Sequence, residues 1–315
     1  MPPLLRRILL APIPRLVLTG LLGFGLVWLL GRIAPSIMAY PNVGFVGALR
    51  NAILTFVVFA LALYLFERKL PSQAGLAPAR ALPDTARGFV IGATLLTVVT
   101  GVLALAGSYR ILGWAVLPDG TSRAFLFGKM TLMFLAVGIF EELLSRGIIF
   151  RQLEQAIGTW LAMAVSALLF GFGHRNNPGA TWVSSVAIAV EAGALLAAAY
   201  VATRSLWLPI GIHWAWNLFE GPVWGSRVSG NDIAVLARSS FPGPALLTGG
   251  AFGPEAGLPA MVLGTALGVA FMVVAIRRNQ IITPRWMHWI GTHLRGRGPD
   301  AMPPEPAPAV PPPAV

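Results

Sequence analysis

Eight apolar segments dominate the chain and leave few ways for it to fold. A membrane-spanning helix needs about 20 apolar residues, and each segment reaches or approaches that length. The apolar runs are continuous and do not alternate, which favours helices over a barrel. We therefore predict an all-α, polytopic membrane protein with about eight transmembrane helices, at residues 16–34, 46–66, 88–106, 125–150, 159–174, 182–201, 206–223 and 258–276.

Composition indicates that these helices are surrounded by lipid. Charged residues make up 11% of the chain, against about 25% in a typical soluble domain. The net charge is +11, but the basic residues lie mostly between the apolar segments. Their bias toward one side places both termini in the cytoplasm by the positive-inside rule, and no nucleic-acid partner is expected. The chain contains no cysteine, which excludes disulfides, thiolate metal sites and a Cys nucleophile.

The sequence divides into three regions. Residues 1–84 hold the N-terminal transmembrane helices, and residues 85–280 form a transmembrane core that contains most of the polar residues within apolar segments. Residues 281–315 are first basic and then rich in proline, which predicts a disordered cytoplasmic tail. Within the core, the Gly- and Pro-rich loop at 225–257 predicts an ordered cap or a re-entrant turn.

Five ionisable residues stand out within the apolar segments of the core. An ionisable side chain inside a span costs about 2.5 to 3.5 kcal/mol, and such residues usually mark function. They are Glu141, Glu142, His174, Glu191 and His213. Polar side chains on separate helices must face one another, because facing lipid would leave them without partners.

Helical spacing gives three of these residues a neighbour on the same helix face. Residues four apart lie on one face, so Glu142 can pair with Arg146, and His213 lies beside Asn217. Phe170 is placed beside His174 in the same way.

The chemistry that this set supports is activation of water. A carboxylate shielded from bulk water can act as a general base near neutral pH. An imidazole can orient a water molecule or bind zinc, and an Asn amide can donate to a developing oxyanion.

A purely structural interpretation stays open for each feature. A lone histidine can serve helix packing, and one Glu–Arg pair can be a buried bridge. Two adjacent glutamates are harder to explain in this way, because one is enough to match Arg146. Glu191 is assigned either a structural or a supporting role, and Glu220, near a span end, is expected at the membrane interface.

Three short motifs in this order resemble a known family. EELLSR, at residues 141–146, resembles the EExxxR motif of the CPBP group of intramembrane proteases, which includes the CAAX prenyl endopeptidases and bacterial Abi proteins. FGFGH, ending at His174, is similar to the FxxxH motif of that group, and HWAWN, beginning at His213, is similar to its HxxxN motif. The resemblance covers about residues 85–280, which it identifies as a CPBP-like protease core.

The resemblance implies a role for each motif residue. Glu141 would be the general base, and Glu142 would help to position water or metal. Arg146 would hold the acidic pair, and His174 would orient the water. His213 and Asn217 would stabilise the oxyanion, with Phe170 and Glu191 in support. The implied function is an intramembrane endopeptidase of a bacterial cytoplasmic membrane, which hydrolyses a membrane-associated peptide or protein within the lipid bilayer.

Alternatives remain at this point. A metal-free mechanism needs no cofactor, whereas a metalloprotease would hold zinc through Glu142, His174 and His213. A non-enzymatic scaffold or bacteriocin-immunity-type protein could keep the same fold, and a small transporter could use the glutamates as a relay. The substrate and the oligomeric state are not predicted.

The expected helix boundaries create one conflict over depth. At about 1.5 Å per residue, Glu141 would lie roughly 10 to 15 Å from the cytoplasmic end of its helix. His174 would lie about 20 Å deep by the same count. The fifth helix would have to tilt or start later for the two side chains to meet.

Overall fold

The structure is a computed structural model that describes residues 10–42 and 44–284 of the chain. Within that part, six helices are long and apolar enough to cross a membrane, at Pro12–Ile33, Phe45–Glu67, Pro78–Leu105, Arg123–Ile157, Trp182–Thr203 and Leu258–Arg277. The prediction of a multi-pass helical membrane protein is therefore confirmed. The expected tail at 281–315, except for its first four residues, lies outside the described residues.

All eight apolar segments are helical, and several helices change type along their length. The main elements are α2 (Pro12–Ile33), α4 (Phe45–Ala62) continued by η1 (Leu63–Glu67), α5 (Ala81–Leu105), α6 (Arg123–Glu142) continued by η4 (Leu143–Phe150) and α7 (Arg151–Ile157), α8 (Thr159–Gly173), α9 (Trp182–Ile188) continued by η5 (Ala189–Ala194) and α10 (Leu195–Thr203), α11 (Trp207–Leu218) continued by η6 (Phe219–Val223), and α13 (Leu258–Arg277). Short pieces connect them: α3 (Pro35–Met38), η2 (Pro71–Ala74), η3 (Pro78–Arg80), α12 (Ala245–Thr248) and η7 (Pro254–Ala256).

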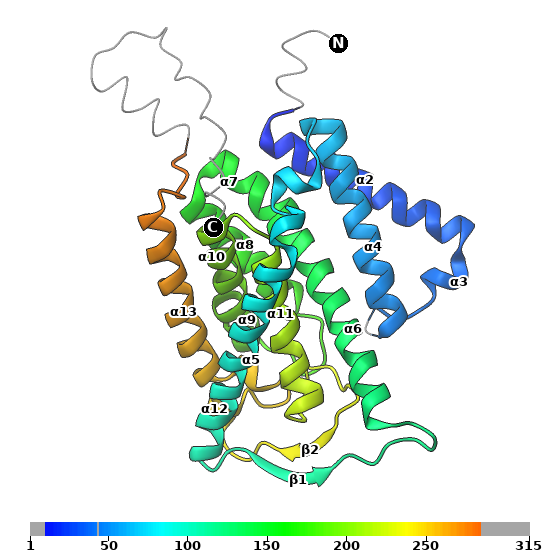
Figure 1. Ribbon diagram of the computed structural model, residues 1–315, viewed down its shortest axis with the longest axis vertical. Coiled ribbons are helices and arrows are strands. Elements are labelled where there is room, and N and C mark those ends of the chain that lie inside the picture. Colours follow the sequence, from blue (N-terminus) through cyan, green and yellow to red (C-terminus); the bar gives the residue numbers. More distant parts are fainter. Residues whose placement is uncertain (1–9, 43, 285–315) are drawn as a thin grey trace, which may run out of the picture.

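Two of the eight predicted spans are shorter than the others. Helix α8 has 15 residues, which is about 22 Å of helix, and α11 has 12 before it changes into η6. A hydrocarbon core is about 30 Å thick. These two helices carry His174 at the end of α8 and His213 within α11, so both histidines lie on the short central elements of the bundle (Figure 1).

A small β-sheet departs from the all-α prediction. Strands β1 (Arg110–Trp114) and β2 (Ala237–Ser240) pair antiparallel, with Arg110 opposite Ser240 and an irregularity between Ile111 and Gly113. The sheet lies at the end of the molecule opposite α7 (Figure 1). Strand β2, α12 and η7 all belong to the loop at 225–257, which is an ordered cap, as one of the two predictions for this loop stated.

Glycines allow α11 to lie very close to α5. A Cβ atom at Gly92 would be 2.2 Å from the carbonyl oxygen of Ile212, and one at Gly211 would be 2.3 Å from that of Thr85. Only a hydrogen atom fits at these positions, as in other close crossings between membrane helices. The crossing therefore fixes the position of α11, and with it the position of His213, which follows Ile212.

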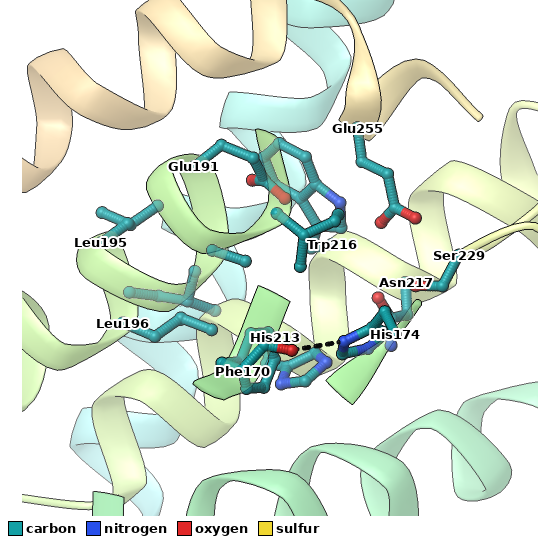
Figure 2. Close-up of a pocket in the computed structure, with 13 residues that line it drawn as sticks. Phe170, His174, Glu191, Leu195, Leu196, His213, Trp216, Asn217, Ser229 and Glu255 are labelled. Atoms are coloured by element: carbon teal, nitrogen blue, oxygen red, sulfur yellow. Dashed lines mark hydrogen bonds between the residues drawn. The ribbon is translucent and has the colours of Figure 1, made fainter. Parts of the chain in front are cut away.

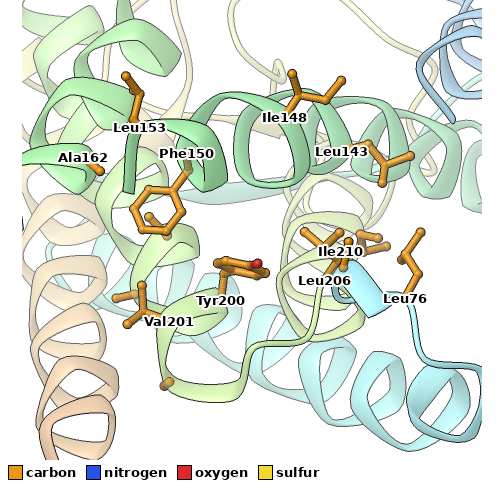
Figure 3. Packing of buried hydrophobic residues seen from close by; sticks show 14 of the residues in the cluster. Leu76, Leu143, Ile148, Phe150, Leu153, Ala162, Tyr200, Val201, Leu206 and Ile210 are labelled. Carbon is orange, nitrogen blue, oxygen red and sulfur yellow. The ribbon is translucent and has the colours of Figure 1, made fainter. Parts of the chain in front are cut away.

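A cluster of apolar side chains lies toward the α7 end of the bundle. It joins η4, α10 and α11 through residues such as Leu143, Phe150, Tyr200 and Ile210 (Figure 3). The rings of Phe150 and Tyr200 meet edge to face at 5.8 Å between centroids. The cluster holds η4 against α10 next to the segment that carries the two adjacent glutamates.

Candidate active site

The two adjacent glutamates lie at the point where α6 changes into a π-helix. Glu141 and Glu142 are the last residues of α6, and η4 begins at Leu143. Helix η5, which carries Glu191, is also a π-helix, and so is η6, which carries Glu220. Short π-helical segments inside α-helices occur frequently at functional sites. Each of these three carries or adjoins a glutamate with a buried side chain, as does the π-helix η1, whose Glu67 is paired with Arg151 at the α7 end.

Glu142 joins two helices through one oxygen atom. Its Oε1 accepts a hydrogen bond from Nη1 of Arg146 at 2.8 Å and one from Nδ1 of His213 at 2.9 Å. The Glu142 side chain has no exposed area. Since a carboxylate only accepts, the Nδ1 of His213 carries the proton. The second ring nitrogen, Nε2, is then the atom of this histidine that remains available to a water molecule or a substrate.

Both histidines present Nε2 to Glu141. The Nδ1 of His174 donates to the carbonyl oxygen of Phe170 at 2.8 Å, which fixes this ring. The Nε2 atoms of His174 and His213 lie 3.7 and 3.8 Å from Oε2 of Glu141. Three helices thus bring one carboxylate and two ring nitrogens to one point. This is the arrangement needed to hold a water molecule beside a general base.

Arg146 fixes the remaining side of the site. Its Nη2 donates to the carbonyl oxygens of Ala192 and Gly193 at 3.1 and 2.7 Å, which ties η4 to η5. Its guanidinium carbon lies 4.6 Å from the centre of the Phe170 ring. A cation over an aromatic face is attracted to it, so Phe170 supports the arginine as well as packing against the two histidines.

The conflict over depth is resolved by the length of the fourth helix. This helix does not end at residue 150 as predicted but continues through η4 and α7 to Ile157. Glu141 is therefore about 24 Å from that end. Helix α8 begins at Thr159, as predicted, and turns back so that His174 lies about 22 Å from the same end. No tilt or later start of α8 is required.

A cavity opens beside the histidines. Part of it is open to the exterior. His174, His213 and Asn217 line one part, and Glu191 and Glu255 line another (Figure 2). The structure thus brings all of the predicted site residues to one region. Asn217 and Glu191 belong to this region because they line the cavity.

The residues do not fit the predicted zinc site. Oε1 of Glu142 is occupied by Arg146 and by the Nδ1 of His213, while the Nε2 of His213 points to Glu141. Among the described residues, no group of three His, Asp or Glu side chains is placed to hold a metal ion. The set of Glu142, His174 and His213 is therefore not retained as a zinc site.

Two further glutamates were not recognised as part of this region. Glu220 was expected at the membrane interface, but it is fully buried, and Glu255 of η7 is 3% exposed. A signal for Glu220 was present, because residues 213, 217 and 220 follow the spacing of one helix face. Glu255 lies in the Gly- and Pro-rich loop, where no periodic pattern marks a buried residue.

Comparison with known proteins finds a related family. Residues 123–219 match the family model described as Rce1-like, type II CAAX prenyl endopeptidase. The matched range contains all the predicted site residues and ends just before Glu220. The match confirms the resemblance to CAAX-type intramembrane proteases. No curated protein matches the chain.

Proposed function

We propose that this protein is an intramembrane endopeptidase that uses Glu141 to activate water. The convergence of Glu141 with the Nε2 atoms of His174 and His213 carries the proposal, because it places a general base and two orienting groups at one point. The resemblance to CAAX-type proteases supports the same reaction class.

The reaction balances with groups of this chain and one water molecule. The Glu141 carboxylate takes a proton from water while the water oxygen attacks the carbonyl carbon of the peptide bond. The amide of Asn217, with His213 when its Nε2 is protonated, donates to the oxyanion that forms. The Glu141 carboxylic acid then gives its proton to the leaving nitrogen as the C–N bond breaks. His174 accepts a hydrogen bond from the attacking water and orients it.

Glu142 and Arg146 act in this scheme by holding His213. The carboxylate fixes which ring nitrogen carries the proton, and it attracts positive charge on the ring when the oxyanion forms. Arg146 in turn holds Glu142 and prevents an unpaired buried charge. Neither side chain needs to touch the substrate.

We also infer the setting of the protein from the charge pattern. Residues 10–12 and the end of α13 lie at the same end of the bundle (Figure 1), which agrees with an even number of spans. The bias of basic residues favours the cytoplasmic side for that end. The proposed location is a bacterial cytoplasmic membrane, with eight spans, both termini in the cytoplasm and a membrane-associated substrate.

The test is cleavage of a quenched-fluorescent library of membrane-anchored peptides by the purified full chain in detergent. Glu141→Gln should lower cleavage about 1,000-fold at an unchanged melting temperature. Asp232→Asn is the matched control, because its carboxylate is 80% exposed and pairs only with Arg227 among the described residues. A chelator should leave the rate unchanged. Cleavage that survives Glu141→Gln would contradict the proposal.

A further inference from the structure

The cavity beside the candidate active site ends in carboxyl groups that the proposed reaction does not use. Glu191 of η5, Glu220 of η6 and Glu255 of η7 are 1%, 0% and 3% exposed. Glu191 and Glu255 line the cavity directly, and Glu220 lies behind Glu255. Three separate segments therefore place acidic groups in one buried region.

Each of these carboxyl groups keeps one buried oxygen without a hydrogen-bond partner among the described residues, while Glu255 is otherwise hydrogen-bonded to Glu220 and Ser229. Oε1 of Glu191 and Oε1 of Glu255 are buried, and within 10–42 and 44–284 neither has a hydrogen-bond partner. Oε1 of Glu220 accepts from the backbone N–H of Glu255 at 3.2 Å, but its Oε2 is also without a partner there. Buried polar atoms are normally hydrogen-bonded, so exceptions need an explanation.

Arg146 does not supply the missing donors. Its side-chain hydrogen bonds go to Glu142 and to the carbonyl oxygens of Ala192 and Gly193. It attracts Glu191 only through space. Five carboxyl groups in the region thus share one guanidinium and two imidazoles. A buried carboxylate without a partner is costly, so the region favours the entry of a cation.

The residues that line the cavity are of the types that bind a long cation with an apolar stem. Leu195, Leu196 and Ile212 line its sides, and Trp216 lies between Glu191 and Glu255 (Figure 2). Figure 2 shows Glu191 and Glu255 on one side of the cavity and His174 and His213 on the other. An aliphatic chain can lie against leucine, and a guanidinium or ammonium is attracted both to an indole face and to carboxylates.

A small metal ion is a poorer match to the same groups. The described residues include no set of three His, Asp or Glu side chains placed to bind one ion. An arginine head has five N–H donors in a planar fork, and a lysine head has three. Such a head can reach carboxylate oxygens that are too far apart to share an ion.

We propose that this cavity is a specificity pocket that takes the side chain of a lysine or arginine next to the scissile peptide bond. The proposal rests on the proposed endopeptidase function, because it places the basic residue relative to the bond cut at Glu141. Glu220 and Glu255 lie beyond the segment that matches the family model. The pocket therefore adds a preference for basic substrates that the family match does not itself imply.

Binding can be tested without cleavage. The probe is n-butylguanidinium, and the neutral control of the same shape is n-butylurea. Both are titrated into the full chain in detergent, and the shift in melting temperature is measured for the wild type, Glu191→Gln and Glu255→Gln. Glu154→Gln is the matched control, because Glu154 is also a buried glutamate but pairs with Arg204 at the α7 end. Each shift is taken against the same variant without probe.

The expected result is a saturable shift with butylguanidinium and none with butylurea. Glu191→Gln should weaken the binding about 30-fold, since removal of one partner of a buried, hydrogen-bonded charge pair has an effect of this size or larger. Glu154→Gln should bind as the wild type does. Equal shifts in melting temperature with both probes would overturn the proposed pocket function. Butylguanidinium binding that is unchanged in both Glu191→Gln and Glu255→Gln would overturn it as well.

Selection is then tested with substrates. Membrane-anchored peptides that differ only in carrying lysine, arginine or norleucine beside the cleaved bond are compared in the wild type and in Glu191→Gln. Wild-type kcat/KM should favour the basic peptides, and the variant should lose that preference. A wild type that cleaves all three equally would overturn the proposal. Butylguanidinium binding without cleavage of any peptide would instead contradict the endopeptidase function and leave the cation pocket in place.

Discussion

Two buried groups of charges can be compared in this protein, and they differ in how completely their carboxylates are paired. At the α7 end, Glu67 accepts hydrogen bonds from both Nη atoms of Arg151 at 2.6 and 2.7 Å and from Gln152 at 2.8 Å. Glu154 is paired in the same way with Arg204 and also accepts from Thr159. Every carboxylate oxygen of these two glutamates has a donor.

The candidate active site is paired much less completely. Glu141 and Glu142 each keep one buried Oε2 atom without a hydrogen-bond partner among the described residues, and the three glutamates around the cavity do the same with one oxygen each. A buried pair with all its hydrogen bonds serves the fold, whereas unfilled acceptors are a cost that function can explain. The comparison separates buried charges that stabilise the bundle from buried charges that are available to a water molecule or a substrate.

The largest expected effect comes from Arg146, because its buried ion pair with Glu142 serves both the stability of the bundle and the candidate active site. Arg146→Met would leave Glu142 buried without its cation, and we expect a loss of about 3 to 5 kcal/mol in stability. Glu142 would also no longer be held in position to accept the hydrogen bond from Nδ1 of His213. Cleavage should therefore disappear. Thermal unfolding and cleavage per folded molecule measure the two effects.

The double variant Glu142→Gln with Arg146→Met is the control for this experiment. Replacing both members of a buried pair is often close to neutral for stability. The double variant should therefore regain much of the melting temperature while remaining inactive. An Arg146→Met protein that melts at the wild-type temperature would contradict the role given to this residue.

The second effect separates the two charge groups. Glu154→Ala would leave Arg204, whose side chain is 18% exposed, without its carboxylate. We expect a loss of about 3 kcal/mol in stability, at the low end for a buried pair because solvent reaches the arginine. Cleavage per folded molecule should stay unchanged, since Glu154 lies far along α7 from Glu141. Lower kcat at full folding would show that the α7 end is coupled to the site.

The third effect should appear in the reaction and not in the fold. Asn217→Ala removes the proposed amide donor to the oxyanion, and we expect kcat to fall about 100-fold, equivalent to about 2.7 kcal/mol. The melting temperature should change little. Asn217→Asp, which keeps the shape but offers an acceptor, should not restore the rate. A change in KM alone would place Asn217 in binding of the substrate instead.

Much of the fold could be predicted because lipid imposes simple rules. Each apolar segment became a helix, since a backbone in lipid must satisfy its own hydrogen bonds. The order of the motifs predicted which helices meet, and the contacts among Glu141, His174 and His213 agree with it. The small β-sheet was not predicted, because its two short strands come from separate loops at one end of the bundle.

Features without a hydropathy signal were harder to predict. The fourth helix was predicted to end at residue 150, where the continuous apolar run stops and Arg151 follows. The helix in fact continues, since Arg151 is paired with Glu67 and needs no water. Glu255 was missed for a related reason, because the burial of a loop residue depends on what packs over it and not on its local sequence.

The smallest predicted effect tests whether the cavity carboxyl group of Glu255 lacks a cationic partner, and it is read from the pH dependence of stability. Burial raises the pKa of Glu255 above its ordinary 4.5, against the opposing effects of the hydrogen bond with Glu220 and of the charge on His174. The folded state therefore holds this proton more tightly than the unfolded chain does. The contribution to stability is present below pH 4.5 and is lost as pH rises through the folded pKa. In Glu255→Gln, the melting temperature should accordingly fall less steeply with rising pH than in the wild type, whereas Glu154→Gln should not flatten the curve in this range. Parallel curves for the wild type and Glu255→Gln would mean that Glu255 is already matched by a cation. The difference in pairing between the two charge groups would then not extend to Glu255.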